Sequence, residues 1–354
     1  NLWSIEECLE KWNQECQIRN SKFEEKQIAS RIQFVDATWF HKGERNGMRE
    51  YENGPRLPGA FHWDIGELAT TKEFFPEENP KGLKNVFPPE WLVGGVLDRM
   101  GVTASTNADP NANVQTTLVV YGREGTLFAA RVWYLLRTYY TAGPVRLLQG
   151  SMEEWMQQGG PVDRTPLQST IRAKDLVGLY RSQGGGGGPQ EQQQQYPLIS
   201  TEARSRLVDK QFVLHVLGVD SNKGDGVVVS DISGPGASLP SKPSVIIDTR
   251  GSSFAKNGHM PGALHIPYSS LSLQEDALTL KPRMELEEIV LEALGGDPSR
   301  FDALRSQPPL LTWGTGVSVC TLALVLDQLG FPEAWIYDGS WNEWGQDPLT
   351  PKAS

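Results

Sequence analysis

The sequence His-Met-Pro-Gly-Ala-Leu-His-Ile-Pro at residues 259–267 repeats the pattern of Arg-Leu-Pro-Gly-Ala-Phe-His-Trp-Asp at residues 56–64. A short apolar segment that contains an aspartate precedes each copy: Phe-Val-Asp-Ala-Thr at residues 34–38 and Ile-Ile-Asp-Thr-Arg at residues 246–250. Short apolar segments of this kind are typical of buried parallel strands. The two halves of the chain therefore share a strand followed by a Pro-Gly-Ala turn, which indicates an internal duplication.

The duplication continues along each half. After a helical pattern at residues 2–18, the first half has a β-rich segment at residues 116–122 and a helical pattern at residues 128–140. In the second half, an apolar segment at residues 309–314 precedes a helical pattern at residues 318–329. Alternating strands and helices predict an α/β fold with two tandem domains, each a parallel sheet flanked by helices.

The length of the chain agrees with this division, because 354 residues correspond to about two domains of average size. We predict an N-terminal domain at residues 1–160 and a C-terminal domain at residues 201–354. Residues 161–200 are predicted to be a mobile linker, since they contain the low-complexity sequence GGGGGPQEQQQQYP at residues 184–197. A polar stretch at residues 219–243 is predicted to be a surface insertion in the second domain.

Charge and cysteine content limit the classes of partner. The chain has 33 Lys and Arg residues against 43 Asp and Glu residues, a net charge of −10, so we expect no nucleic-acid partner. No apolar run approaches the ~18 residues of a membrane span. Three cysteines cannot form a disulfide framework and have no zinc-ligand spacing, so we expect neither a metal nor a cofactor. The chain begins at Asn1, which a cleaved targeting peptide or a missing tail would explain.

Motifs of a distinctive kind occur in order along nearly the whole chain. They are VDATWF at residues 35–40, LPGAFHWDI at 57–65, AARVWYLLR at 129–137, GHMPGALHIP at 258–267, WGTGVSVC at 313–320 and YDGSWNEW at 337–344. In this order, the motifs resemble those of the tandem-domain rhodanese family, which comprises thiosulfate and 3-mercaptopyruvate sulfurtransferases. The resemblance implies two rhodanese-like domains, with an active loop after a strand of the second domain.

The loop of this chain departs from the family pattern at the position that matters most. In the family, a cysteine thiolate opens a loop close to Cys-Gly-Ser-Gly-Val-Thr and carries the transferred sulfur as a persulfide. The corresponding residues here are Trp313, Gly314, Thr315, Gly316, Val317 and Ser318. Tryptophan has no thiolate, and its indole only donates a hydrogen bond. We therefore expect no catalytic residue in this loop and expect the indole to fill the substrate pocket.

A second departure concerns the substrate carboxylate. By resemblance, Asp248 and Arg250 are vestiges of the family's strand end, and a second arginine is expected a few residues later. Ser253 stands at about that position, so a two-arginine clamp is incomplete. In the N-terminal domain, Gly122 stands at about the position of Trp313 and offers no nucleophile either.

Several other residues have two interpretations. Cys320 is either a relocated nucleophile or a small core residue about two turns into a helix, and we favour the core. Asp36 and Asp248 at strand ends suit acid–base chemistry, although such residues more often orient a turn. His259 and His265 lack partners that would make a metal site. Gly314, Thr315 and Gly316 resemble part of a phosphate loop but lack its lysine and length.

The resemblance and its departures lead to three hypotheses about function. The first is a catalytically inactive protein, a pseudoenzyme, that serves as a structural or interaction subunit of a larger assembly. The compartment implied by the resemblance is mitochondrial, with the cytoplasm as the alternative. An ATP synthase, a respiratory complex or a ribosome are examples of such assemblies. The second hypothesis is a sulfurtransferase that uses Cys320. The third is a sensor that binds a small anion through residues 314–318.

Overall fold

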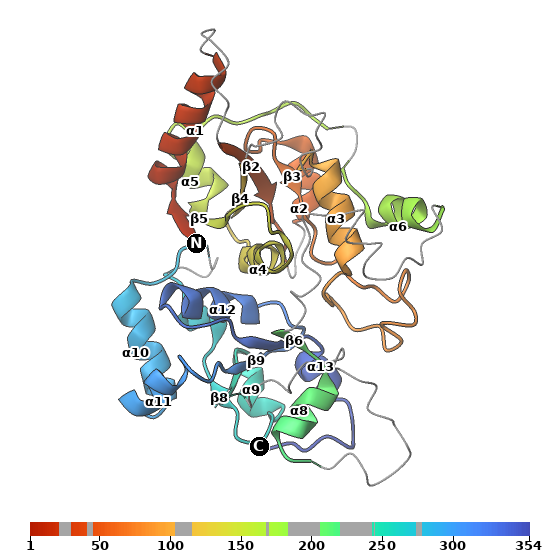
Figure 1. Ribbon diagram of the computed structural model, residues 1–354, viewed down its shortest axis with the longest axis vertical. Helices are drawn as coiled ribbons and strands as arrows, with labels where there is room; N and C mark the ends of the chain where they lie inside the picture. The colour runs from red at the N-terminus through yellow and green to blue at the C-terminus, as the bar shows by residue number, and fades with distance from the viewer. Residues whose placement is uncertain are drawn as a thin grey trace. The chain divides into compact units, whose positions relative to one another are not determined.

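In the computed structural model, the described part of the chain forms ten strands that pair into two separate sheets, each with five parallel strands (Figure 1). The structure describes residues 1–20, 30–40, 45–102, 115–167, 170–182, 206–219, 243, 245–273 and 278–354. Unit 1 consists of Asn1–Ala203 and Ser272–Lys281, and unit 2 consists of Arg204–Leu271 and Pro282–Ser354. Each unit contains one of the two sheets.

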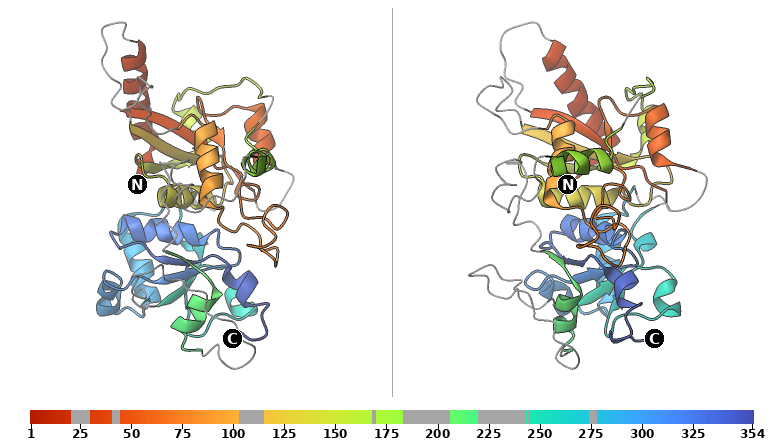
Figure 2. Two further views of the ribbon diagram at one scale, coloured as in Figure 1. Left: turned by 45° about the vertical axis from the view of Figure 1, so that its right-hand side comes forward. Right: turned by 90° about the vertical axis from the view of Figure 1, so that its right-hand side faces the viewer.

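Unit 1 alternates strands and helices along the chain. Its elements are β1 Leu2–Ser4, α1 Ile5–Asn20, β2 Ser30–Asp36, α2 Gly47–Asn53, β3 Phe61–His62, α3 Glu90–Arg99, β4 Gln115–Gly122, α4 Ala129–Tyr139, β5 Val145–Ser151, α5 Met152–Gln157 and α6 Ala173–Ser182. The strand order in the sheet is β1-β5-β4-β2-β3. Figures 1 and 2 show α1 and α5 on one side of this sheet and α4 on the other.

The core of unit 1 forms because alternate residues of the central strands point to opposite faces of the sheet. Phe34 and Tyr121 pack with Trp155 of α5 and Tyr51 of α2 on one face. The Phe34 ring contacts Trp155 edge-on, with ring centroids 5.7 Å apart. Both faces are buried, which explains the nearly continuous apolar sequences of β2 and β4.

Unit 2 repeats this arrangement with shorter strands. Its elements are β6 Leu207–Val208, α8 Lys210–Val216, β7 Ile246–Asp248, α9 Ser253–Lys256, β8 Leu264–His265, the 3-10 helix η2 Tyr268–Ser270, α10 Arg283–Ala293, α11 Pro298–Ala303, β9 Leu310–Thr312, α12 Val319–Gln328, β10 Trp335–Tyr337 and α13 Ser340–Trp344. The strand order is β6-β10-β9-β7-β8, which is the order of unit 1. The predicted fold class, two parallel sheets flanked by helices, is confirmed.

The start of the chain differs from its prediction. Residues 2–18 have a helical pattern, yet Leu2–Ser4 forms β1 and pairs with β5, and the helix starts at Ile5. Ser4 caps this helix, because its Oγ accepts a hydrogen bond of 3.1 Å from the amide of Glu7. The sequence did not reveal β1 because three residues are too few for a recognisable strand pattern next to sixteen helical residues.

Unit 1 also extends beyond the predicted domain boundary at residue 160. Part of the predicted linker, residues 161–200, folds onto this unit: Arg56 forms an ion pair of 2.9 Å with Asp163, and Tyr180 of α6 stacks on Trp91 with ring centroids 4.0 Å apart. The low-complexity residues 184–197 lie outside the described residues, and so does nearly all of the predicted insertion at 219–243. Within the described ranges, the structure contains no helix with the length and hydrophobicity that a bilayer crossing requires.

Candidate functional site

The loop between β9 and α12, residues 313–318, is held in shape by backbone contacts with α13. The amide of Trp341 donates a hydrogen bond of 2.7 Å to the Trp313 carbonyl, and the amide of Asn342 donates one of 2.9 Å to the Gly314 carbonyl. The Trp313 amide in turn donates to Oγ of Ser340 at 3.3 Å. The loop conformation therefore depends on main-chain groups rather than on the identity of its first side chain.

Gly316 is the loop residue whose conformation requires glycine. Its φ is +75°, and a Cβ atom there would lie 2.8 Å from the carbonyl oxygen of Asp338. The next two residues, Val317 and Ser318, are fully buried. Oγ of Ser318 lies 3.3 Å from Oγ1 of Thr249, and the Thr249 amide donates 2.9 Å to the Thr312 carbonyl. These contacts bring the loop and the end of β7 together.

Trp313, the first residue of this loop, is half-buried. Its indole meets the ring of Tyr268 edge-on, with centroids 6.2 Å apart. Tyr268 belongs to η2, a short turn whose residues the sequence analysis did not single out. The first side chain of the loop is therefore an indole in contact with a neighbouring aromatic ring, and an indole has no thiol that could ionise.

Cys320 lies in the first turn of α12, since that helix begins at Val319. The sequence predicts a position about two turns into the helix, which is wrong because the loop continues through Ser318. Its side chain is fully buried, and its Sγ lies 4.0 Å from the Gly316 carbonyl oxygen. Cys8 of unit 1 is also fully buried, and burial raises the pKa of its thiol to about 12. A buried neutral thiol is a poor nucleophile.

Asp248 and Arg250 form a buried ion pair at the end of β7. Nη2 of Arg250 lies 2.8 Å from Oδ2 of Asp248, and its Nε donates to both carboxylate oxygens, at 2.9 and 3.1 Å. Arg250 is 2% exposed, donates a further hydrogen bond of 2.8 Å to the Gly258 carbonyl, and packs over the ring of Trp341 at 4.2 Å. The guanidinium thus stabilises the turn after β7.

The predicted clamp position and both histidines lie beside this ion pair. Ser253 begins α9, and its carbonyl accepts a long hydrogen bond of 3.4 Å from Nη1 of Arg250. His259 and His265 both stack on the ring of Phe254, with ring centroids 4.1 and 4.3 Å from its centroid. Among the described residues, no group of three or more His, Cys, Asp or Glu side chains is arranged to hold a metal.

Unit 1 has a different set of groups at the corresponding strand end. Oδ1 of the buried Asp36 accepts a hydrogen bond of 2.9 Å from the Thr38 amide and lies 3.5 Å from Nδ1 of His62. Burial alone would raise the pKa of Asp36, but the hydrogen bond and charge of His62, together with Arg123, hold it below the usual 3.8. The amide of Arg123, directly after Gly122, donates 3.2 Å to Oγ1 of Thr38.

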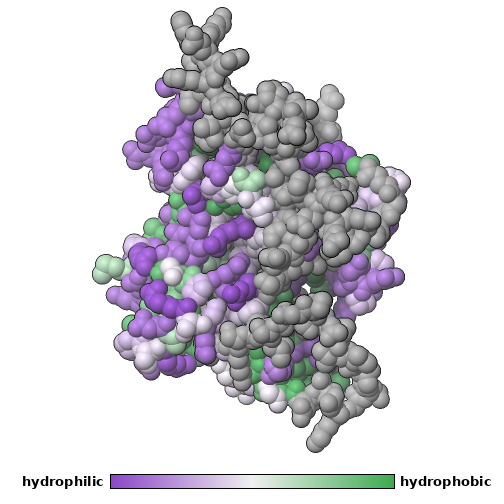
Figure 3. Space-filling view, in the orientation of Figure 1, coloured by the Kyte–Doolittle hydropathy of each residue, from purple (hydrophilic) through white to green (hydrophobic). Residues whose placement is uncertain are grey.

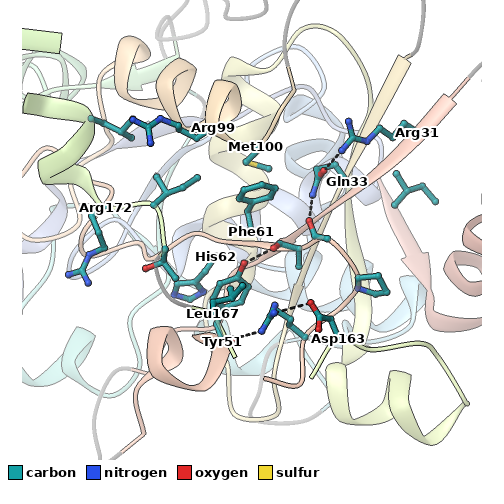
Figure 4. Close-up of a pocket in the computed structure, with 18 of the residues that line it drawn as sticks. Arg31, Gln33, Tyr51, Phe61, His62, Arg99, Met100, Asp163, Leu167 and Arg172 are labelled. Carbon is teal, nitrogen blue, oxygen red and sulfur yellow. Dashed lines mark hydrogen bonds and ion pairs between the residues drawn. The ribbon is translucent and has the colours of Figure 1, made fainter. Parts of the chain in front are cut away.

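Sequence reasoning missed a cavity of about 690 Å³ in unit 1. Figure 4 shows its walls, which include Phe61 and His62 of β3 and Arg99 at the end of α3. Its remaining walls come from parts of the chain as far apart as Trp12 and Leu176. No local motif signals such a cavity, because its walls meet only when the sheet and the segment after α5 are assembled.

Comparison with known proteins shows which proteins this chain is similar to. Residues 237–347 match the rhodanese-like domain. The chain is 25% identical over 332 residues to thiosulfate/3-mercaptopyruvate sulfurtransferase 2 of Arabidopsis thaliana, covering 90% of this chain and 81% of that protein. It is 24% identical over 319 residues to the 3-mercaptopyruvate sulfurtransferase of Homo sapiens, covering 88% and 84% of the two chains.

Solved structures agree on the fold. Tum1 of Saccharomyces cerevisiae superimposes with a TM-score of 0.62 at 18% identity and covers 98% of this chain and 96% of its own. SseA of Escherichia coli, a 3-mercaptopyruvate sulfurtransferase, gives 0.58 at 22% identity and covers 96% and 98%. The chain therefore has the tandem rhodanese-like fold, and its relatives at low identity are sulfurtransferases.

Proposed function

We propose that this chain is a rhodanese-like protein without sulfurtransferase activity that serves as an interaction subunit of a protein assembly. The observation that carries the proposal is the β9–α12 loop, which places Trp313 at its first position. The only cysteine of unit 2, Cys320, is fully buried. A persulfide needs an accessible thiolate, and neither residue supplies one.

The state of Arg250 supports the same proposal. Its guanidinium is engaged by Asp248 and by the Gly258 carbonyl, so binding a substrate carboxylate would require breaking a buried ion pair. Ser253 adds no second cation. A sulfurtransferase that uses Cys320 would need both a substrate site without this clamp and an opening of the first turn of α12.

A groove between α10 and α11 supports an interaction role. Coloured residues in Figure 3 are mostly hydrophilic, whereas Met284 is 74% exposed and lines a hollow of about 270 Å³ with Leu291 and Phe301. Glu287 and Glu288 also line it. We assign this groove to a partner segment that has an apolar side chain next to Lys or Arg residues, because its rim is acidic.

The compartment is part of the proposal. One relative, at 24% identity, is named as the mitochondrial thiosulfate/3-mercaptopyruvate sulfurtransferase 1 of Arabidopsis thaliana. We place this chain in mitochondria on that analogy, with the cytoplasm as the alternative, and subcellular fractionation distinguishes the two.

Sulfur-transfer assays test the loss of activity. Purified chain is incubated with cyanide and either thiosulfate or 3-mercaptopyruvate, and thiocyanate is measured beside the rat thiosulfate sulfurtransferase. We expect no turnover above background. Trp313→Cys is expected to gain a trace of activity, and Trp313→Cys with Ser253→Arg is expected to gain more. Wild-type turnover near that of the rat enzyme, lost in Cys320→Ala, would establish the sulfurtransferase instead.

Native particle size tests the interaction role. In a gentle lysate, the chain is expected to migrate in a particle much larger than its own 39.2 kDa, with an identifiable partner. Met284→Glu is expected to release the chain from this particle. Leu179→Glu places the same charge at another exposed apolar residue, in α6, and serves as the control. Migration of the wild-type chain as a monomer contradicts the proposal.

A further inference from the structure

The cavity of unit 1 has no part in the proposed function, yet it combines chemical groups in a way that suits a ligand. Its walls are formed by the start of β2, by β3, by the end of α3 and by residues that follow α5 (Figure 4). All of these belong to unit 1. Its volume of about 690 Å³ lies within the range of small-molecule sites.

The charges that line the cavity have an excess of cations. Four arginines and two aspartates line it, which gives a formal charge of 4 − 2 = +2 without its histidine. The whole chain, by contrast, carries −10. The lining groups are Arg31, Arg56, Arg99, Arg172, Asp163 and Asp175. A local positive site in an acidic protein attracts anions of small size.

Two of these arginines already have carboxylate partners. Arg56 pairs with Asp163 at 2.9 Å, and Arg172 pairs with Glu67 at 2.6 Å. Arg31 donates to the amide oxygen of Gln33 at 3.0 Å, and Arg99 is exposed at the end of α3. Among the described residues, neither Arg31 nor Arg99 forms an ion pair with a carboxylate, so these two remain available to an anion.

The wall between these cations is apolar. In Figure 4, Met100 and Phe61 lie between the guanidinium groups of Arg31 and Arg99. Trp12 also lines the cavity and packs against Phe34, with ring centroids 5.1 Å apart. Aromatic and thioether side chains of this kind suit an aromatic or aliphatic body.

A buried histidine adds a polar group to the lining. The side chain of His62 is 1% exposed, and its Nε2 has no hydrogen-bond partner among the described residues. Tyr51 stacks on its ring at a centroid distance of 5.3 Å and so fixes its orientation. Since buried polar atoms normally have partners, a ligand hydroxyl or carboxyl group that reaches His62 would satisfy this nitrogen.

We propose that the cavity of unit 1 binds a small organic anion whose apolar body lies on Phe61, Met100 and Trp12 and whose negative charge is stabilised by the positive field of Arg31 and Arg99 on either side. This site is separate from the β9–α12 loop and does not depend on whether that loop is active. It requires no metal and no covalent step.

Two matched probes test the charge requirement. Titration calorimetry of the full chain uses 8-anilinonaphthalene-1-sulfonate, an aromatic sulfonate, and N-phenyl-1-naphthylamine, which has the same rings without the sulfonate. We expect the sulfonate to bind one site per chain, about tenfold more tightly than the neutral amine. Arg99→Ala and Arg31→Ala are each expected to weaken sulfonate binding by about fivefold to tenfold and to leave amine binding unchanged.

Control variants separate this site from other surfaces. Arg49→Ala removes an exposed arginine of α2 that does not line the cavity, and Met284→Glu blocks the groove of α10 and α11. Both are expected to bind the sulfonate like the wild type, and thermal melts confirm that every variant is folded. Sulfonate binding that is insensitive to Arg99→Ala and Arg31→Ala, or that is lost in Met284→Glu, overturns the proposal.

Discussion

Each unit buries an aspartate at the end of the corresponding strand of its own sheet, Asp36 in β2 and Asp248 in β7, but different side chains neutralise the two carboxylates. In unit 2, Asp248 is paired with Arg250, only two residues further along the chain. In unit 1, the carboxylate of Asp36 lies beside the imidazole of His62, a residue of the neighbouring strand β3. A carboxylate inside a protein must be paired, and duplication of a fold leaves open which residue pairs it.

The strand end of unit 2 is held by many contacts, whereas the strand end of unit 1 lies beside a cavity. The Arg250 guanidinium makes contacts in several directions, with Asp248, the Gly258 carbonyl and the Trp341 ring. His62 lines a cavity and keeps a nitrogen without a partner among the described residues. The polar groups at the strand end of unit 2 therefore stabilise the fold, whereas His62 at the strand end of unit 1 has a nitrogen that a ligand could bind.

The largest effect is expected when the ion pair of unit 2 is broken. Arg250→Met leaves Asp248 buried without its partner and is expected to lower the free energy of unfolding of unit 2 by about 3–5 kcal/mol. Urea unfolding, with hydrogen exchange of peptides from β7 and β9, measures this loss. Replacing both residues, Asp248→Asn with Arg250→Met, is expected to recover part of it.

A surface ion pair provides the control for this prediction. Arg283 and Glu287 of α10 pair at 3.0 Å, with their side chains 58% and 41% exposed. Arg283 also donates to the Gln328 and Leu329 carbonyls, so the control removes the carboxylate instead: Glu287→Gln is expected to cost about 0–1 kcal/mol because solvent screens such pairs. Similar losses for Arg250→Met and Glu287→Gln would mean that the buried pair contributes no more than a surface pair.

The next largest effect concerns Asp36 in unit 1, and it depends on pH. Asp36→Asn keeps an oxygen for the Thr38 amide but removes the charge beside His62, so we expect a loss of about 1–3 kcal/mol at pH 7. The pKa of Asp36 is lower in the folded chain than its usual value of 3.8. The stabilisation is therefore complete above about pH 4 and disappears as the pH falls through the lower, folded pKa.

Unfolding curves between pH 2 and pH 7 check the sign of this effect. The wild-type chain should lose more stability than Asp36→Asn on acidification, so the two should converge at low pH. Asp98→Asn, which changes an exposed carboxylate of α3, is expected to follow the wild type. Parallel curves for the wild type and Asp36→Asn would show that Asp36 does not titrate with a lowered pKa.

Sequence reasoning predicted the parts of this fold that depend on local pattern. The β2 and β7 strand ends and the Pro-Gly-Ala turns repeat within a few residues, so the duplication and the parallel sheets could be inferred from them. The position of Trp313 after a strand also followed from a local motif. In the structure, residues 313–318 connect β9 to α12, in agreement with the strand and helix that the motif predicts on either side of them.

Contacts between distant residues could not be predicted in this way. The ion pair of Arg56 with Asp163 spans 107 residues and attaches the segment after α5 to unit 1, beyond the predicted boundary. Residues 272–281 likewise belong to unit 1 although they follow β8 in the chain. The cavity beside β3 depends on such contacts, because its charged and apolar walls come from separate segments.

A smaller effect is expected from the ring that stacks on each β-strand histidine. In unit 1, the Tyr51 hydroxyl donates a hydrogen bond of 2.5 Å to the Ala60 carbonyl, whereas Phe254 stacks on His265 of unit 2 without a hydroxyl. Tyr51→Phe makes the two stacks alike and is expected to cost about 1 kcal/mol, since the buried Ala60 carbonyl loses its donor. Equilibrium unfolding measures the change, and a loss above about 3 kcal/mol would mean that the stack itself is disturbed.

An effect on stability similar in size to that of Tyr51→Phe is expected at the loop between β9 and α12. Trp313→Ala gives unit 2 a small side chain at this position, where unit 1 has Gly122. Because Trp313 is half-buried and meets Tyr268 edge-on, losing its indole is expected to cost about 1 kcal/mol. The amides of Trp341 and Asn342 still hold the loop carbonyls, so hydrogen exchange at the start of α13 should stay as slow as in the wild type. If the indole fills an anion site at this loop, thiosulfate should bind to Trp313→Ala and not to the wild type in titration calorimetry. Thiosulfate binding by the wild type with equal affinity would show instead that the loop is already open to anions and that Trp313 does not close it.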